Sequence, residues 1–266
     1  MFTPGDLITS SSRDVELDKG KHWRARLGFI LMSTDLACES DLFDMVPEGV
    51  AINITRLKTD DYTTNETLAR HIDGMADAAS RIQPDTPPDV VCYSCTSGTI
   101  VNGEQRVMDE IRKGAANSTP MTLVTGVVDA LRELEVKKLV VGTPYLDEIN
   151  TLEAEFFHEK GFEILDIQGL NLEDGISFGR ITPRYLKEFA LSIDQPEADA
   201  IFLSCGGIRS LDVVAEIEQV AGKPVITSNQ GMMWSCLRRA GITDEIKGFG
   251  QIFSKPGKSL TSLSSG

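Results

Sequence analysis

Short apolar runs alternate along the chain with segments in which apolar residues recur at the three- and four-residue spacing of a helix. The runs predict buried strands at residues 26–32, 50–56, 89–95, 120–125, 138–143, 162–167, 200–205 and 224–228. The spaced segments predict helices at residues 66–82, around 107–111, and at 127–134, 149–160, 185–193, 210–220 and 231–239. Strands that alternate with helices predict an α/β fold with parallel sheets.

The two halves of this pattern repeat one motif. Residues 89–95 and 199–205 each begin with Asp, continue through an apolar run and end in Ser-Cys, so Cys95 and Cys205 stand at equivalent positions. The repeat predicts two pseudosymmetric Rossmann-like (flavodoxin-like) halves. Because open α/β sheets bind ligands at the carboxyl ends of their strands, we expect one active site in the cleft between the halves.

The repeat and the polarity of the chain suggest its organisation. We assign residues 1–25 to a polar N-terminal arm, residues 26–135 with about 224–256 to the first half, and residues 136–223 to the second half. The arm lacks the apolar centre of a signal peptide. No apolar run approaches the ~20 residues that cross a bilayer. These features predict a cytoplasmic protein with no membrane partner.

Composition narrows the classes of partner. The chain has 266 residues, of which 41% are hydrophobic and 25% charged, and its formal net charge is −14. These proportions are typical of a globular protein with a substantial core. A nucleic-acid partner is not expected, because neutralising a phosphate backbone requires a basic face.

Five cysteines and three histidines offer candidate chemistry. An odd number of cysteines in a reducing compartment predicts free thiols. The histidines stand far in sequence from any cysteine pair, which argues against a zinc site. Cys92 and Cys95 have redox-motif spacing, but three positions along a strand place them on opposite faces. We therefore expect Cys38, Cys92 and Cys236 to be core residues.

Cys95 and Cys205 are the principal candidates for catalysis. Each is predicted at a strand-to-helix turn, where unpaired backbone N–H groups lower the pKa of a thiol. Two such thiols facing one pocket could move protons on opposite faces of a carbon atom. A lone buried cysteine is more often a small hydrophobic residue, but two matched Ser-Cys turns favour a function.

Other residues near predicted strand ends are candidates for binding. Thr96 and Ser97 supply hydroxyls that would hold a carboxylate, and the same residues would cap a helix. Gly206 permits a close approach of the backbone. Asp35 and Tyr145 follow two further strands, where a solvated acid and a packing residue are the simpler interpretations.

Several segments resemble the aspartate/glutamate racemase superfamily, in its maleate isomerase and arylmalonate decarboxylase branch. They are Cys-Thr-Ser-Gly at 95–98, Thr-Pro-Tyr-Leu-Asp-Glu-Ile-Asn at 143–150, and Leu-Ser-Cys-Gly-Gly at 203–207 followed by Leu-Asp at 211–212. The similarity extends from about residue 28 to residue 250, and the ectoine-utilisation group is the most similar member. The resemblance implies a homo-oligomer without a metal or other cofactor. It implies catalysis by Cys95 and Cys205, with substrate carboxylate contacts from Thr96, Ser97, Tyr145 and Gly206.

Two features separate the chain from members of that branch. The decarboxylases keep the second cysteine and lack the first, so Cys95 favours two-thiol chemistry. Maleate isomerases carry Asn where Asp35 stands, and another Asn near Gly175. Because an Asp repels a second carboxylate and attracts an amine, the resemblance implies an amino acid or an ectoine-derived substrate rather than maleate.

Four functions follow from these residues. The first is a cofactor-independent racemase or isomerase of a small carboxylate, working by proton transfer or by thiol addition to a double bond. The second is an arylmalonate-type decarboxylase that uses Cys205 alone. The third is a catalytically silent sensor that binds a small ligand, and the fourth is a thiol-redox protein.

Overall fold

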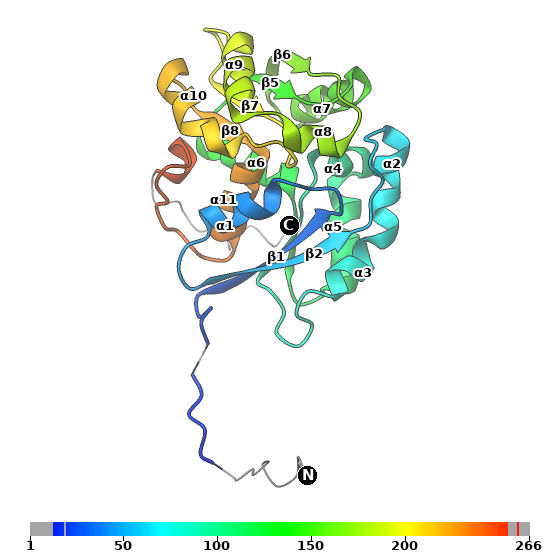
Figure 1. Ribbon diagram of the computed structural model, residues 1–266, viewed down its shortest axis with the longest axis vertical. Helices are drawn as coiled ribbons and strands as arrows, with labels where there is room; N and C mark the ends of the chain where they lie inside the picture. Colours follow the sequence, from blue (N-terminus) through cyan, green and yellow to red (C-terminus); the bar gives the residue numbers. More distant parts are fainter. Residues whose placement is uncertain (1–12, 19, 255–259, 261–266) are drawn as a thin grey trace, which may run out of the picture.

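The computed structural model describes residues 13–18, 20–254 and 260, and its two α/β halves lie one against the other (Figure 1). Each half contains a four-stranded parallel sheet, in the order β2-β1-β3-β4 in the first half and β6-β5-β7-β8 in the second. The equivalent strand orders confirm the predicted α/β fold with two related halves.

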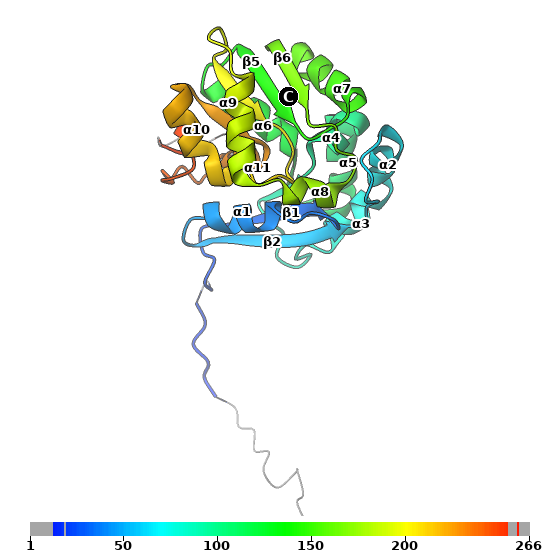
Figure 2. The ribbon, with the colours of Figure 1, turned by 45° about the horizontal axis from the view of Figure 1, so that its top comes forward.

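The strands begin near their predicted positions. Those of the first sheet are β1 (Ala25–Met32), β2 (Val50–Leu57), β3 (Val90–Tyr93) and β4 (Thr119–Thr122). Those of the second sheet are β5 (Lys138–Thr143), β6 (Glu163–Gly169), β7 (Ala200–Leu203) and β8 (Val225–Thr227). Both sheets and the helices that flank them are visible in Figure 2.

Helices connect the strands and cover the sheets. The first half contains α1 (Cys38–Met45), α2 (Asn65–Ala69), the 3-10 helix η2 (Arg70–Gly74), α3 (Met75–Ser80), α4 (Thr96–Asn102), α5 (Glu104–Gly114) and α6 (Leu123–Glu133). The rest of the chain contains α7 (Asp147–Glu159), α8 (Gly175–Arg180), α9 (Pro183–Ile193), η3 (Leu211–Val213), α10 (Val214–Ala221), α11 (Ser228–Arg239) and η4 (Gln251–Phe253).

Several predicted elements are wrong in extent. The predicted strand 120–125 ends at Thr122, because the Thr122 side chain accepts the Thr125 N–H and caps α6. The predicted helix 66–82 is divided into α2, η2 and α3, with boundaries after Ala69 and after Gly74, and a Cβ at Gly74 would lie only 2.7 Å from Leu57. The predicted helix 210–220 starts as η3 and becomes α10. Helices α1 and α8 were not predicted.

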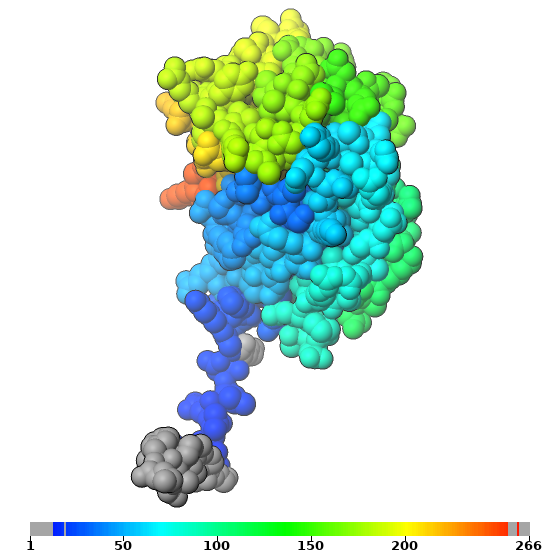
Figure 3. Space-filling model, turned by 45° about the vertical axis from the view of Figure 1, so that its right-hand side comes forward, coloured from blue at the N-terminus to red at the C-terminus, as the bar shows by residue number. Residues whose placement is uncertain are grey.

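The two halves share a core. One hydrophobic cluster contains Leu27 and Cys92 of the first sheet together with Phe202 of the second. The space-filling view shows the blue and cyan first half in contact with the green and yellow second half (Figure 3). β8 pairs with β7, whereas α11 packs against α6 and α1. The assignment of residues 224–256 to the first half, and the division at residue 136, stay predictions.

The predicted arm is described in part. Residues 13–18 and 20–24 contain no helix or strand, and residues 1–12 and 19 lie outside the described residues. Among the helices in the described part of the chain, none is long and apolar enough to cross a membrane.

The order of the strands determines where a ligand would bind. In each sheet the chain adds strands first toward one edge and then toward the other. The change falls between the two central strands, β1 and β3 in the first sheet and β5 and β7 in the second. The loops that follow such a pair separate and leave a crevice at the carboxyl ends. Both crevices open toward the boundary between the halves, where the site lies.

Candidate active site

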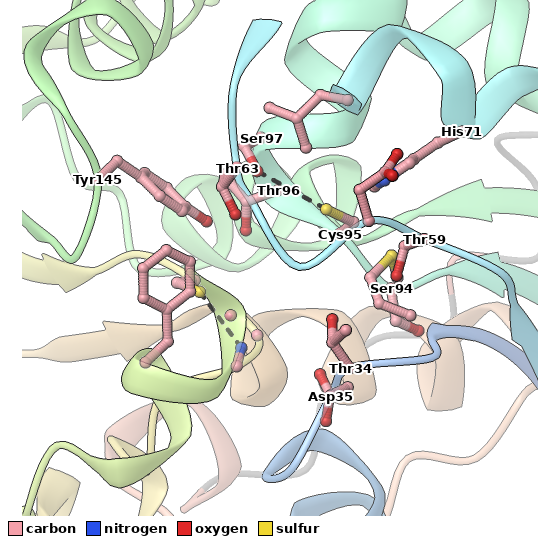
Figure 4. Close-up of a pocket in the computed structure, with 18 of the residues that line it drawn as sticks. Thr34, Asp35, Thr59, Thr63, His71, Ser94, Cys95, Thr96, Ser97 and Tyr145 are labelled. Carbon is pink, nitrogen blue, oxygen red and sulfur yellow. Dashed lines mark hydrogen bonds between the residues drawn. The ribbon is translucent and has the colours of Figure 1, made fainter. Parts of the chain in front are cut away.

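One cavity is lined by residues that follow β1, β3, β5 and β7. In Figure 4, Thr34 and Asp35 lie on one side of it, Cys95 and His71 on another, and Tyr145 extends toward it from the opposite side. The lining includes every site residue expected from the sequence, namely Asp35, Cys95, Thr96, Ser97, Tyr145, Cys205 and Gly206. The two sheets therefore bring the predicted residues to one place.

Cys95 stands directly before α4 and caps that helix. Its backbone is extended, and its sulfur accepts the Gly98 N–H at 3.3 Å and lies 3.7 Å from the Ser97 hydroxyl oxygen. Burial raises the pKa of the Cys95 thiol, while hydrogen bonds from the Gly98 N–H and from the Ser97 and Tyr93 hydroxyls oppose the rise by stabilising the thiolate. The strand-to-helix turn predicted at Cys95 is confirmed.

Cys205 has a different geometry. Its φ of 109° lies in the region that favours glycine, and its sulfur accepts the Gly207 N–H at 3.3 Å. The prediction that Cys205 also starts a helix is wrong, because Gly206 and Gly207 turn the chain and the next helix, η3, begins at Leu211. A non-glycine residue held at such a φ costs of order 1–3 kcal/mol and is typical of functional sites.

The electrostatic surroundings of Cys205 also differ from those of Cys95. Burial raises the pKa of the Cys205 thiol to about 12, and hydrogen bonds from Tyr145 and the Gly207 N–H oppose the rise. Burial likewise raises the pKa of Tyr145 well above its usual value. Tyr145 therefore stays protonated at neutral pH and is available as a hydrogen-bond donor.

Ser228, at the start of α11, contacts both of the turns that carry the thiols. Its Oγ accepts the Cys205 N–H at 2.9 Å and lies 3.0 Å from Thr96 Oγ1. Ser228 is fully buried, so water does not compete for these contacts. Ser228 was not expected among the site residues. The available signal in the sequence was its place at the end of the last predicted strand, residues 224–228.

Asp35 occupies the loop after β1. Its Oδ1 accepts the N–H groups of Ala37 at 3.0 Å and Cys38 at 2.8 Å. Burial nevertheless raises the pKa of this carboxyl to about 6. The charge of Asp35 in turn contributes to the raised pKa values of both Cys95 and Cys205. Asp35 is thus electrostatically coupled to both thiols.

The other ionisable groups that line the cavity are Asp60, Tyr62 and His71, besides Asp35, the thiols and Tyr145. Burial lowers the pKa of His71 to about 4, so its ring is neutral at neutral pH. Neither Lys nor Arg is among the described lining residues. Asp60 is paired with Arg70 at 2.8 Å, so a second carboxylate on a ligand would meet the Asp35 carboxyl and no cationic lining residue.

A buried polar pair lies beside the Cys95 turn. The Nδ1 atom of His71 is 2.6 Å from the hydroxyl oxygen of Tyr93, and both side chains are buried. Tyr93 ends β3 two positions before Cys95, so the two residues share a face of the strand. Neither His71 nor Tyr93 was expected from the sequence. The available signal was the difference between Tyr93 in one motif and Leu203 in the other.

A second buried network supports the turn after Cys205. The Asn229 side-chain amide donates to Asp41 Oδ2 and to the Gly206 carbonyl, both at 2.8 Å. Burial raises the pKa of Asp41 to about 7. These contacts hold the Gly206 backbone in place, and neither Asn229 nor Asp41 was expected from the sequence.

The remaining cysteines belong to the core. Cys38, Cys92 and Cys236 are buried free thiols, as the sequence predicts. Within the described ranges there is no group of three or more His, Cys, Asp or Glu residues that could hold a metal ion.

Known proteins resemble this chain in sequence. Residues 45–253 match the arylmalonate decarboxylase family. A maleate isomerase of Pseudomonas putida is 24% identical over 244 residues, which cover 86% of this chain and 97% of that protein. An arylmalonate decarboxylase of Bordetella bronchiseptica is 27% identical over 189 residues, which cover 69% of this chain and 78% of that protein.

A solved structure also resembles this chain in fold. It is a maleate cis-trans isomerase of Nocardia farcinica, in a Cys-to-Ser variant with a covalently bound succinylcysteine intermediate. Its TM-score is 0.80 at 22% identity, with 86% of this chain and 98% of that chain covered.

Proposed function

The chain belongs to the arylmalonate decarboxylase family, and from that premise we propose that it is a cofactor-independent racemase or isomerase of a small carboxylate. The observation that carries the proposal is that Cys95 and Cys205, from different halves, line one cavity. A thiolate on one side of a bound carbon atom removes its proton, and a thiol on the other side returns one.

Hydrogen-bond donors around the cavity would hold the substrate carboxylate. Thr96 and Ser97 line it from the first half, and Tyr145 and Gly206 line it from the second. Loss of the α-proton moves negative charge onto the carboxylate oxygens as an enediolate. Donors already fixed in place by the fold stabilise that charge without reorganising.

The two thiols would have different roles. The Cys95 sulfur accepts a backbone N–H and faces two hydroxyls, which favours its thiolate as the base. Cys205, with a pKa of about 12, favours the thiol as the acid. The α-proton passes to Cys95 Sγ, and the Cys205 S–H proton passes to the opposite face of the carbon. One turnover leaves Cys95 as the thiol and Cys205 as the thiolate.

The same residues would serve an isomerase that works by addition. The Cys95 thiolate would form a C–S bond to one carbon of a double bond, and the Cys205 proton would pass to the other carbon. Rotation about the resulting single bond, loss of that proton to Cys205 and cleavage of the C–S bond would give the isomeric alkene and restore both sulfurs.

We propose a substrate with a cationic group beside its carboxylate, such as an amino acid or an ectoine-derived compound. Asp35 supplies negative charge, and the described lining residues include neither Lys nor Arg, whereas the Asp60 carboxylate is already paired with Arg70 at 2.8 Å. An ammonium or amidinium group would find a partner there, whereas a dicarboxylate such as maleate would be repelled.

An arylmalonate-type decarboxylase is the second candidate, and the family match and the Bordetella relative support it. In that reaction Cys205 alone would protonate the enediolate left when CO2 departs. Cys95 would then be dispensable, so Cys95→Gly would retain CO2 release from an arylmalonate. Loss of all activity in Cys95→Gly would favour the two-thiol reaction.

The decisive experiment is incubation of the purified protein with amino acids and with dicarboxylic acids in D2O. We expect exchange of the α-proton, seen by proton NMR, accompanied by inversion or isomerisation, and faster turnover of the amino-bearing compounds. The Cys95→Ser/Cys205→Ser double variant is the control. Thermal stabilisation by a ligand with neither exchange nor isomerisation would instead identify a catalytically silent binding protein.

A further inference from the structure

The two Ser-Cys motifs differ at the residue two positions before the thiol. Tyr93 precedes Cys95, whereas Leu203 precedes Cys205. Cys95 continues the extended backbone of β3, so Tyr93 and Cys95 share a face, whereas the positive φ of Cys205 breaks this alternation after Leu203. The first thiol therefore has a hydroxyl from its own strand, and the second has none.

Tyr93 connects the first thiol to His71. The Tyr93 hydroxyl oxygen is fully buried with its side chain and lies 2.6 Å from His71 Nδ1. His71 is 6% exposed and lines the cavity. Figure 4 shows His71 and Cys95 on the same side of that cavity. A path of polar atoms therefore leads from the Cys95 sulfur through the buried hydroxyl to a ring that borders the cavity.

Gly98 shows how closely these groups converge. A Cβ atom at Gly98 would overlap the Tyr93 hydroxyl and would lie 3.1 Å from both Cys95 Sγ and His71 Nδ1. The absence of a side chain at this position leaves room for the three groups to meet. The same glycine donates its N–H to the Cys95 sulfur.

We propose that Tyr93 and His71 form a proton relay between Cys95 and the water of the cavity, with Tyr93 as a catalytic residue and His71 as a positioning residue that acts through it. The relay rests on the proposed function, in which Cys95 ends a turnover protonated and must lose that proton before it acts again as a base.

The protons balance along the path. The Cys95 S–H bond breaks and its proton forms an O–H bond on Tyr93, while the original Tyr93 proton passes to His71 Nδ1. The proton on His71 Nε2 passes to a water molecule. Tyr93 and His71 remain neutral, and Cys95 becomes a thiolate that now accepts a hydrogen bond from Tyr93.

The groups around His71 favour its neutral ring, which can pass a proton on without remaining protonated. Burial and Arg70 lower the pKa of His71 to about 4, and Asp60 opposes them. Burial also raises the pKa of Tyr93 well above its usual value, so the phenol passes a proton without resting as an anion. Around Cys95, Asp35 disfavours the thiolate, whereas Ser97, Tyr93 and the Gly98 N–H favour it.

The relay is tested by the ionisation of Cys95, which requires no substrate. The rate of Cys95 alkylation by iodoacetamide is measured against pH, with each labelled cysteine identified by peptide mass spectrometry. In Tyr93→Phe we expect the Cys95 midpoint to rise by about one pH unit, which lowers its alkylation near neutral pH about ten-fold. In the thiolate state Tyr93 donates to Cys95 and accepts from the protonated Nδ1 of His71. The amide oxygen of His71→Asn would instead hold the Tyr93 proton away from the sulfur, so the Cys95 midpoint should rise in this variant too.

Cys205 provides a comparison within each sample, and its alkylation rate should change far less than that of Cys95 in either variant. Gly98→Ala offers an independent test, since it separates the three groups while keeping both side chains, and it should raise the Cys95 midpoint in the same way. Circular dichroism and thermal unfolding establish that each variant is folded.

An unchanged Cys95 midpoint in Tyr93→Phe would overturn the relay. A shift in Tyr93→Phe with an unchanged midpoint in His71→Asn would overturn the role of His71. Failure of the proposed function is seen separately, as absence of exchange in D2O by the parent protein.

Discussion

The turns at Cys95 and Cys205 begin with the same Ser-Cys sequence but have different backbone geometries. Cys95 is extended and caps α4, where the Thr99 hydroxyl donates to the Cys95 carbonyl at 2.7 Å. Cys205 has a positive φ and leads into two glycines. Thr and Ser, which are common at the start of a helix, follow the first thiol. Two glycines, which allow the backbone to turn, follow the second. The comparison teaches that equivalent motifs need not place their thiols in equivalent environments.

The two turns also differ in what surrounds the sulfur. Cys95 faces Tyr93 of its own strand, whereas Cys205 faces Tyr145 from the loop after β5. Ser228 bonds to both turns, and the charge of Asp35 reaches both thiols. Substitution of one thiol should therefore give a different result from substitution of the other, while substitutions at Asp35 and Ser228 should affect both turns.

Replacement of either thiol should have the largest effect. Cys95→Ser and Cys205→Ser should each lose racemisation or isomerisation by about 10³-fold or more, because a Ser hydroxyl is a far weaker acid than a thiol. Cys205→Ser should still exchange the α-proton of one enantiomer, since Cys95 can still remove it, whereas Cys95→Ser should exchange that of the other enantiomer far more slowly, since the Cys205 thiolate is scarce at neutral pH. Proton NMR in D2O on each enantiomer measures the difference. Equal residual exchange in the two variants would contradict the separate roles of the thiols.

Asp35→Asn should change the pH dependence of stability. The folded-state pKa of about 6 lies above the usual 3.8, so the unfolded chain loses this proton first and the free energy of unfolding falls as pH rises from about 4 to about 6. Asn at this position does not titrate, so the fall in the free energy of unfolding between pH 4 and pH 6 disappears. Its amide oxygen still accepts the Ala37 and Cys38 N–H groups. The variant should be more stable than the parent above pH 6, by up to about 2–3 kcal/mol.

Urea unfolding at pH 4 and at pH 7.5 measures this gain, and iodoacetamide alkylation of the same samples reports both thiols. Removal of the charge should speed the alkylation of Cys95 and Cys205 alike. A stability gain of the same size at the two pH values would mean that Asp35 does not titrate in this range.

Ser228→Ala should have the smallest of these effects. The Cys205 N–H would lose its buried acceptor, which costs about 1–3 kcal/mol in the free energy of unfolding. Ser94→Ala is the matched control, because the buried Ser94 hydroxyl makes no hydrogen bond to the described residues and its loss should have little effect. Equal destabilisation by the two substitutions would show that the contacts of Ser228 do not stabilise the turns.

The apolar pattern predicted most of the framework. Strand β5 has its predicted bounds, and β1, β2 and β7 differ from prediction by at most two residues at either end. Predictions failed where a side chain capped a helix early, as at Thr122, or where packing interrupted a helix, as at Gly74. In those places the outcome depends on contacts that periodicity does not contain.

The residues of the candidate site likewise include some that the sequence could predict and some that it could not. Asp35, Cys95, Tyr145 and Cys205 could be predicted to meet because each follows a central strand, and parallel sheets bring those ends to one edge. His71 and Ser228 could not, because they lie on η2 and at the start of α11, and the position of each depends on how its helix packs.

The sequence by itself determined that two thiols stand at matched strand ends, since the run of apolar residues and the small residues after it are local properties. Only the tertiary fold sets the electrostatic surroundings in which the two thiols differ. The Tyr145 hydroxyl at Cys205, the Asp35 carboxylate that reaches both sulfurs and the His71 ring beside Tyr93 come from distant segments, and burial sets the strength of their effects.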